Sequence, residues 1–180
     1  MENFKNHLKS FGFIKKDPKK DSMVPKYIKP DGTKVIEQPC ELGLAVYEIS
    51  PDCTVICRTY DNSNKLILDY IRRTNLEIGH RYNEFGQKVY EFNNLYDEHN
   101  ILAKKTEIEY EYYDEGQVSK ETIVIIPGEI KTEIMYNKNG KQIEKIEYRG
   151  SVKTWFNENN KPIKREIDRG SGGIITENLE

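Results

Sequence analysis

The chain has 180 residues, of which 36% are hydrophobic and 32% are charged, and its net charge at pH 7 is −2. The hydrophobic share lies below the roughly 45–50% of typical globular domains, which favours a thin, wide β-sheet over a thick core. No run approaches the roughly 18 apolar residues of a membrane-spanning helix. The amino-terminal sequence also lacks the apolar segment of a secretory signal. We therefore expect a cytoplasmic protein with no membrane partner. The abundance of Lys, Asn, Ile and Glu is typical of bacteria.

The amino-terminal region, residues 1–41, is predicted to hold a short helix followed by a first β-hairpin. Phe4, Leu8 and Phe11 follow the i, i+4, i+7 spacing that gives a helix one apolar face. We expect this helix to cover an edge or a face of a sheet, with docking to a partner as the alternative. The stretch KYIKPDGTKVIEQ that follows has the pattern of a hairpin whose turn contains Pro30-Asp31-Gly32.

Six segments of the chain share one pattern, and this repeat is the strongest signal in the sequence. Each has Tyr or Phe, usually Asp or Asn, two variable residues, Gly or Asn, often Lys or Gln, and then an aliphatic residue. The segments begin 22, 14, 17, 23 and 20 residues apart, and the fourth is one residue short. A repeat near 20 residues predicts a repetitive architecture. The segments are YDNSNKLI from Tyr60, YNEFGQKV from Tyr82, YDEHNILA from Tyr96, YDEGQV from Tyr113, YNKNGKQI from Tyr136 and FNENNKPI from Phe156.

Each position of the pattern has a mechanical role in closing a β-hairpin. Asp or Asn after the aromatic residue can bond to its own backbone two residues on and start a type I turn. Gly or Asn three residues later tolerates the left-handed conformation that closes a short hairpin with a bulge. The aromatic and aliphatic residues that flank the turn face each other across the two strands. The predicted structural turn residues are Asp61, Asn64, Asn83, Gly86, Asp97, Asn100, Asp114, Gly116, Asn137, Gly140, Asn157 and Asn160.

The segments between these turns alternate between apolar and polar residues, as β-strands do. The predicted fold class is therefore mainly β: a single antiparallel β-meander of repeated hairpins, with a short amino-terminal helix. We expect the repeated sheet to span residues 42–168. Residues 169–180, which begin DRGSGG, are expected to form a flexible carboxyl-terminal tail. The three regions together are expected to make one folded domain.

The repeated pattern resembles the tyrosine–aspartate (YD) repeats of Rhs-type bacterial proteins, in which a Tyr-Asp-x-x-Gly turn recurs about every twenty residues. It is also similar to small bacterial β-repeat proteins of the MORN-like antitoxin kind. The resemblance covers the chain from Tyr60 to Asp168, with Asn in place of Asp in three copies and Asn in place of Gly in three. Six copies are too few to enclose a cargo as large Rhs shells do. The resemblance implies a β-repeat fold and an antitoxin-type role.

The sequence contains no recognisable catalytic or cofactor motif. None of GxxxxGK[ST], GxGxxG, GxSxG or HExxH occurs. His7, His80 and His99 stand apart from one another, so we expect ordinary surface or turn histidines. We therefore expect a protein that is not an enzyme and that has no cofactor.

The three cysteines, Cys40, Cys53 and Cys57, lack the CxxC spacing of a zinc site. An odd number of cysteines is expected to be free thiols in a reducing compartment. Cys53 and Cys57 are four residues apart, which predicts that they share one face of a strand as a buried thiol pair. No metal site is expected.

The charge is distributed unevenly along the chain. Residues 77–134 contain six Lys and Arg against 13 Asp and Glu, whereas residues 1–36 contain nine against four. In the stretch TEIEYEY the residues Glu107, Glu109 and Glu111 fall on one face of the predicted strand, and we expect this face to be exposed. A solvated sheet face is one interpretation. The other is a surface steered toward a basic partner, which would repel nucleic acid.

From these features we expect a non-catalytic protein-binding module. It is predicted to be a cytoplasmic immunity protein or antitoxin that neutralises a cognate bacterial toxin by occluding its active site. The partner is expected to have a basic cleft, such as that of a nuclease, and nucleic acid is not expected to bind. The oligomeric state is left open. The predicted partner-binding residues are Glu107, Glu109, Glu111, Asp114, Glu115 and Tyr113.

Two other functions fit the same sequence. The first is a structural or adaptor repeat protein of the YD type without an inhibitory role. The second is an unrecognised enzyme or small-ligand-binding protein that uses the concave side of a curled sheet. A deep pocket with convergent polar groups would favour the latter.

Overall fold

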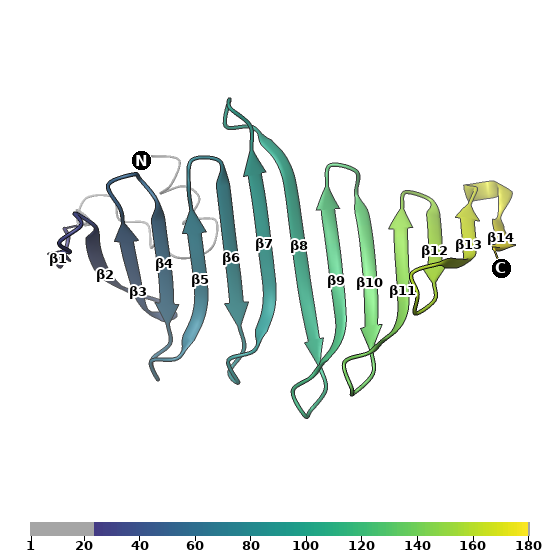
Figure 1. Ribbon diagram of the computed structural model, residues 1–180, viewed down its shortest axis with the longest axis horizontal. Coiled ribbons are helices and arrows are strands. Elements are labelled where there is room, and N and C mark those ends of the chain that lie inside the picture. The colour runs from purple at the N-terminus through teal and green to yellow at the C-terminus, as the bar shows by residue number, and fades with distance from the viewer. Residues whose placement is uncertain (1–23, 180) are drawn as a thin grey trace. The chain divides into compact units, whose positions relative to one another are not determined.

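The computed structural model of the chain describes residues 24–179, and the helix predicted within residues 1–16 lies outside them. The described residues form fourteen strands and one short 3-10 turn. They belong to two compact units, the first ending at Thr74 and the second beginning at Asn75. In both units each strand pairs antiparallel with its neighbour in the chain (Figure 1). This arrangement confirms the predicted fold class, a mainly β antiparallel meander.

Unit 1 buries one face of its sheet. The register places Ile36, Tyr47, Cys57 and Tyr70 opposite one another in a row across four strands. All four side chains are buried. Burying such side chains stabilises the fold by about 1.5–3 kcal/mol each, so this row is the core of unit 1. The strands are β1 (Tyr27–Ile28), β2 (Lys34–Cys40), β3 (Gly43–Ile49), β4 (Val55–Tyr60) and β5 (Leu66–Arg72).

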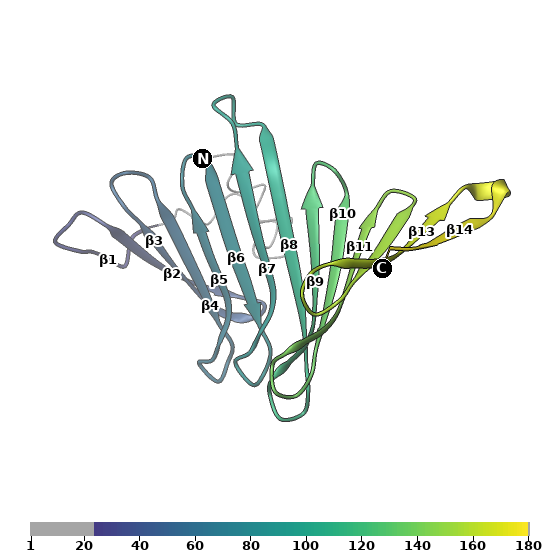
Figure 2. The same cartoon turned by 45° about the vertical axis from the view of Figure 1, so that its right-hand side comes forward.

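Unit 2 is a longer meander whose hairpins follow one another in chain order (Figures 1 and 2). Its longest strand, β8, has 11 residues, and β7 and β9 have 9 each. The elements are β6 (Leu76–Tyr82), β7 (Lys88–Tyr96), β8 (Leu102–Tyr112), β9 (Val118–Ile126), β10 (Ile130–Tyr136), β11 (Gln142–Arg149), β12 (Val152–Phe156), β13 (Pro162–Asp168), η1 (Gly170–Gly172) and β14 (Ile174–Asn178).

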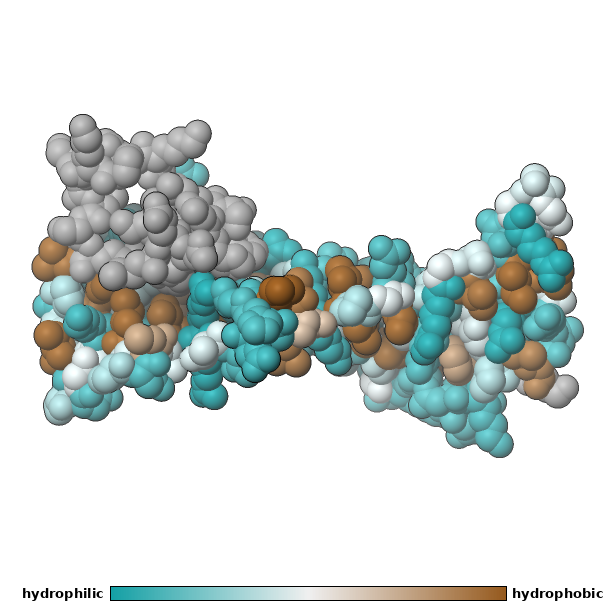
Figure 3. All heavy atoms as spheres, turned by 90° about the horizontal axis from the view of Figure 1, so that it is seen from above, coloured by the Kyte–Doolittle hydropathy of each residue, from teal (hydrophilic) through white to brown (hydrophobic). Residues whose placement is uncertain are grey.

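Much of unit 2 has no deeply buried face. From Val118 to Ile125 every residue of β9 is half-buried, whichever face it lies on. Apolar and polar side chains accordingly alternate at the surface over β11 to β14, at the right of Figure 3. Stability here depends on cross-strand pairs, such as Ile108 opposite Ile123 and Ile146 opposite Trp155, each contributing about 0.2–1 kcal/mol. This sheet exposes both faces to a possible partner.

Eight connections in the two units use one five-residue turn. In each, the N–H of the first residue donates to the carbonyl of the fifth, and the N–H of the fourth donates to the carbonyl of the first. The fourth residue of these eight turns is left-handed: a glycine in four turns, an asparagine in three, and Cys53 in one. The turn 169–173 makes the same two backbone hydrogen bonds, but its fourth residue, Gly172, is not left-handed, so it is not one of the eight. The sequence pattern predicts six of these turns, and Pro30-Asp31-Gly32 indicates a seventh. The eight first residues are Lys29, Ser50, Asp61, Asn83, Asp97, Tyr113, Asn137 and Asn157.

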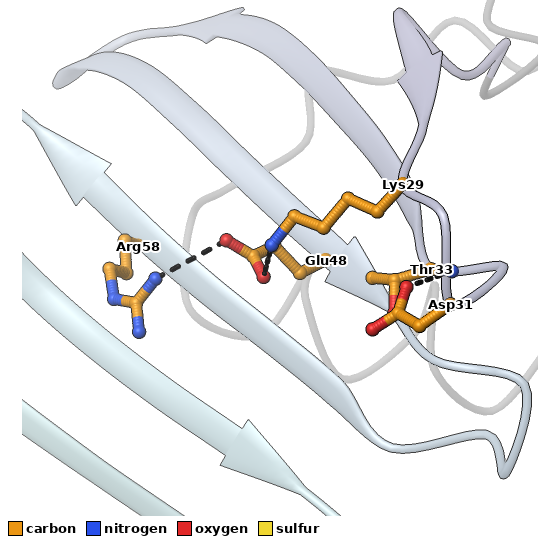
Figure 4. Close-up of polar contacts among 5 residues, drawn as sticks. All are labelled: Lys29, Asp31, Thr33, Glu48 and Arg58. Atoms are coloured by element: carbon orange, nitrogen blue, oxygen red, sulfur yellow. Dashed lines mark hydrogen bonds and ion pairs between the residues drawn. The ribbon is translucent and has the colours of Figure 1, made fainter.

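The Asp or Asn at the first position holds five of the turns in shape. Its side-chain Oδ1 accepts two hydrogen bonds, from the N–H of the third residue and from the N–H of the fifth, at 2.8–3.1 Å. In the turn that begins at Lys29 the carboxylate comes from the third residue instead. There Asp31 Oδ1 accepts from the N–H of Thr33 at 2.9 Å (Figure 4). Lys29 of the same turn pairs with Glu48, which also lies 3.5 Å from Arg58.

The turn role predicted for Asp114 is wrong. Tyr113, not Asp114, occupies the first position, because the N–H of Tyr113 donates to Gln117 and its carbonyl accepts from Gly116. Tyr112 therefore takes the place that the other copies give to the aromatic residue. Aligned on Tyr112, this copy has its full length. Asp114 becomes the exposed second residue of the turn.

The carboxyl-terminal region is not a flexible tail over its whole length. Residues 174–178 form β14, which pairs with β13 from Asp168 opposite Ile174 to Lys164 opposite Asn178. The sequence GSGG misled the prediction, because glycines that suit a flexible segment also suit the tight turn between these strands. The boundary between the two units, at Thr74 and Asn75, coincides with neither predicted boundary at 41/42 or 168/169.

The predicted buried pair of Cys53 and Cys57 is also corrected. Cys53 is the exposed left-handed residue of a turn, whereas Cys57 is buried on β4. Burial raises the pKa of the Cys57 thiol to about 12. Both thiols and that of Cys40 are free.

The left-handed fourth position yields a prediction for Gly140, where φ is +75° and an added Cβ would meet no atom within 4 Å. Gly140→Val should lower the free energy of unfolding by about 1–2 kcal/mol, because a β-branched residue strains this conformation. Gly140→Asn should cost much less, since asparagines occupy the same position in three other turns. Urea unfolding of both variants measures the difference. Equal losses for Val and Asn would contradict the proposed role of the conformation.

Candidate functional site

The predicted alternation along β8 is present in the structure. Glu107, Glu109 and Glu111 pair with residues of one face of β9, and Ile108 and Tyr110 pair with residues of the other. Glu109 and Glu111 are exposed, whereas Glu107 is half-buried. The two faces of β8 are therefore as expected, but the three glutamates are not equivalent.

Glu107 is engaged within the sheet. Its carboxylate accepts a hydrogen bond from the hydroxyl of Tyr90 and lies 2.9 Å from Lys105 Nζ. Burial alone would raise the pKa of Glu107, but the Tyr90 hydrogen bond and the Lys105 ammonium outweigh it, so the pKa is lowered. Partner binding at Glu107 would have to break these contacts. Because Glu107 is half-buried as well as engaged, we assign it to the sheet and not to the candidate site.

Lysines partly neutralise the same face beyond Glu107. Lys120 Nζ lies 3.9 Å from Glu111 and 3.3 Å from Glu133, and Lys131 Nζ lies 2.8 Å from Glu133. The hydroxyl of Tyr148 donates to Glu133 at 3.0 Å. Glu109, by contrast, has no ion pair within residues 24–179. The face as a whole is a charge-paired surface, and its exposed carboxylates, Glu109 and Glu111, lie toward the carboxyl end of β8.

The turn 113–117 continues these carboxylates past the end of β8. Asp114 and Glu115 are exposed on it, and Glu115 pairs with Lys138 of the next turn in unit 2. Tyr113 is half-buried, and its hydroxyl donates to the carbonyl of Tyr136 at 2.6 Å. The hydroxyl of Tyr113 thus connects two hairpins, and this structural role is an alternative to the predicted role of Tyr113 in binding.

Phe85 is a candidate binding residue that the sequence analysis did not single out. It is the third residue of the turn 83–87, and its side chain is 78% exposed. The two turns are neighbours, because Gln87 Nε2 donates to the carbonyl of Gly116 at 3.3 Å. In the five other repeat copies the third turn residue is polar: Ser63, His99, Glu115, Asn139 and Asn159. This contrast is the signal by which the sequence could have identified Phe85.

We define the acidic turn patch as Phe85, Glu109, Glu111, Asp114 and Glu115. It combines a large exposed aromatic side chain with four carboxylates at one end of the β8 strand. Such a surface is suited to binding and has no evident chemistry. No group of three His, Cys, Asp or Glu within the described residues is placed to hold a metal ion. Residues 24–179 also contain no helix of the length and apolarity needed to cross a membrane.

Comparison of the chain with models of known protein families and with curated proteins gave no match. The resemblance to YD-repeat and MORN-like proteins therefore remains a prediction from the six segments.

Glu133 gives a test of the charge pairing beside the patch. Its pKa is lowered from 4.5 to about 2, mainly by the hydrogen bond from Lys131, with further contributions from Tyr148 and Lys120. A carboxyl group whose pKa falls on folding stabilises the native state above pH 4.5, and this stabilisation is lost as the pH falls toward 2. Glu133→Gln should therefore make the free energy of unfolding less sensitive to pH between 5 and 2.

The measurement is urea unfolding at several pH values for wild type and Glu133→Gln. Tyr148→Phe, which removes one hydrogen bond to the carboxylate, should give a smaller change in the same direction. The same acid dependence in wild type and Glu133→Gln would contradict the role assigned to this carboxyl group.

Proposed function

We propose that the chain is a non-catalytic protein-binding module and that the acidic turn patch contacts a basic surface of its partner. The observation that carries the proposal is Phe85, a 78% exposed aromatic side chain beside a turn that bears Asp114 and Glu115. Aromatic residues that become buried at the centre of an interface contribute much of its binding energy. Carboxylates around such an anchor favour partners rich in Lys and Arg and speed their approach.

The patch is held rigid before any partner arrives. Asn83 Oδ1 accepts from the N–H groups of Phe85 and Gln87 at 3.0 and 2.9 Å. The neighbouring turn is fixed by the Tyr113 hydroxyl and by the ion pair of Glu115. A surface that is ordered in the free protein loses little conformational entropy on binding. This favours tight association through a small set of side chains.

We further propose that the partner is a bacterial toxin with a basic active-site cleft, such as a nuclease, which the patch covers. The acidic excess of residues 77–134, six basic against 13 acidic residues, supports this choice of partner. Bound anions would occupy the cleft of such an enzyme, and a rigid acidic turn can replace them. Inhibition would then be steric and electrostatic, without any chemical step.

Identifying the partner is the first experiment. A photo-cross-linking amino acid is placed at Asp114, or at Glu158, which is the second residue of the turn 157–161 as Asp114 is of its own turn. The partner should be captured from native cells through position 114 and not through position 158. The captured protein should inhibit growth when expressed alone, and co-expression of this chain should restore growth. A captured protein without toxicity would contradict the antitoxin role and leave only the binding role.

Charge reversal tests the contribution of the patch. The combined change Glu109→Lys, Glu111→Lys and Asp114→Lys should lower the association rate constant with the captured protein by about 10- to 100-fold at low salt. Its dependence on salt should also flatten, because the attraction between the opposite charges is lost. Stopped-flow or surface plasmon resonance at several salt concentrations measures both.

The matched control compares Asp114→Lys alone with Glu158→Lys, which makes the same charge change at the corresponding turn position. Only Asp114→Lys should slow association. Equal rates for wild type and the triple variant would remove the patch from the interface.

A further inference from the structure

The tip of the β7–β8 hairpin is an exposed apolar knob at the opposite end of β8 from the acidic turn patch. It comprises Leu95, Ile101 and Leu102, which are 40%, 62% and 42% exposed. The hairpin contains the longest strand of unit 2, β8, and its tip projects beyond the β9–β10 and β11–β12 connections at the same end (Figures 1 and 2). Three exposed aliphatic side chains on a projecting tip are unusual for a surface that contacts only water.

The turn itself does not require these apolar residues. Ile101 is the fifth residue of its turn, and the other seven turns of this type have Thr, Lys or Gln there. The turn is held in shape by Asp97 Oδ1, which accepts from the N–H groups of His99 and Ile101. Beside them the side chain of Glu98 is 87% exposed. The register places Leu102 opposite Tyr96 and Leu95 opposite Lys104, so the two leucines lie on opposite faces of the hairpin. The knob is thus a rigid tip with apolar side chains on both faces and an exposed carboxylate.

A groove on one face of β11, β12 and β13 has the complementary character. Its volume is about 400 Å³. The register places Val152 opposite Ile167 and Phe156 opposite Pro162, so four apolar side chains line it together. An apolar floor of this kind gains stability when apolar groups cover it. Its other lining residues are Glu147, Arg149, Thr154 and Arg165.

Cationic side chains outnumber carboxylates around this groove. Arg149 lies 2.7 Å from Glu147, but its side chain is still 64% exposed. Arg165 lies 3.8 Å from Glu177, and its side chain is 42% exposed. Lys145 lies over the ring of Phe156, 4.7 Å from its centroid. Three cations and two carboxylates therefore surround the groove, and the two guanidinium groups can donate hydrogen bonds to a further carboxylate.

From these two surfaces we infer that the β7–β8 knob of one copy of the chain docks in the β11–β13 groove of a second copy. Ile101 and an aliphatic side chain from one face of the knob cover Val152, Phe156 and Ile167, and Glu98 approaches Arg149 or Arg165. Knob and groove are different surfaces, so the contact is heterologous and each copy retains one free knob and one free groove. Copies add head to tail, and the mean mass in solution rises with protein concentration.

A mixing experiment tests the inference directly. Ile101→Asp removes the knob, and Arg149→Glu with Arg165→Glu removes the charge of the groove. By analytical ultracentrifugation the wild type should form species larger than dimers as its concentration rises, whereas each variant alone should remain monomeric. An equimolar mixture should give dimers and nothing larger, because the intact groove of the first variant accepts the intact knob of the second. Dimer formation also shows that both variants are folded.

Ile143→Asp is the matched control, since Ile143 is a 56% exposed isoleucine outside both surfaces. It should assemble as the wild type does. A wild type that stays monomeric at all concentrations would overturn the inference, as would a mixture that stays monomeric. Assembly of Ile101→Asp alone would also overturn it. Loss of toxin binding by Ile101→Asp with unchanged self-assembly would instead assign the knob to the toxin.

Discussion

Eight connections of the meander close through a five-residue turn whose fourth residue adopts a left-handed backbone conformation, and the order of the strands depends on this local constraint. That residue donates its N–H back to the first residue of the turn while its φ is positive, so a residue that disfavours a positive φ strains the reversal at that point. Glycine adopts the conformation without cost and asparagine with little, which is why these two residues fill the position in seven of the eight turns. The strands are then aligned by the turns, and no thick core is needed to choose their neighbours.

The absence of a deeply buried face over much of unit 2 has a functional consequence. Side chains of this sheet are instead paired with one another at its surface, as in the ion pairs of Glu133 with Lys120 of the neighbouring strand and with Lys131 of its own strand. The rings of Tyr148 and Trp155 are likewise covered by lysine side chains. These contacts pair the charged and aromatic side chains on the faces of the sheet with one another. The surfaces left over for a partner are therefore at the ends of the hairpins, where Phe85 and Ile101 break the polar pattern of the turns.

The sequence predicted the fold well because its signal is local. A Tyr followed by Asp or Asn and then by Gly or Asn determines where the chain reverses, and no distant contact needs to be known. The same reasoning failed for Asp114 because a second tyrosine, Tyr113, occupies the turn position and shifts the register by one residue. It failed for β14 because a glycine-rich turn and a flexible tail have the same composition.

The candidate site was harder to predict, since it depends on which turns lie side by side. The alternation of Glu107, Glu109 and Glu111 is visible in the sequence, but one of the two contacts that engage Glu107 comes from Tyr90, which is 17 residues away. Phe85 lies within one of the repeated segments. It becomes part of an acidic surface only because its turn is next to the turn that bears Asp114 and Glu115. Contacts between hairpins thus decide which of the predicted residues remain free to bind.

The most direct test of the proposed binding surface is hydrogen–deuterium exchange of the chain with and without its captured partner. Binding through the acidic turn patch should slow amide exchange in residues 83–87 and 109–117. Exchange in the turn 157–161 should be unchanged. Protection centred on that turn or on β11 to β13, with none at 83–87 and 109–117, would contradict the account.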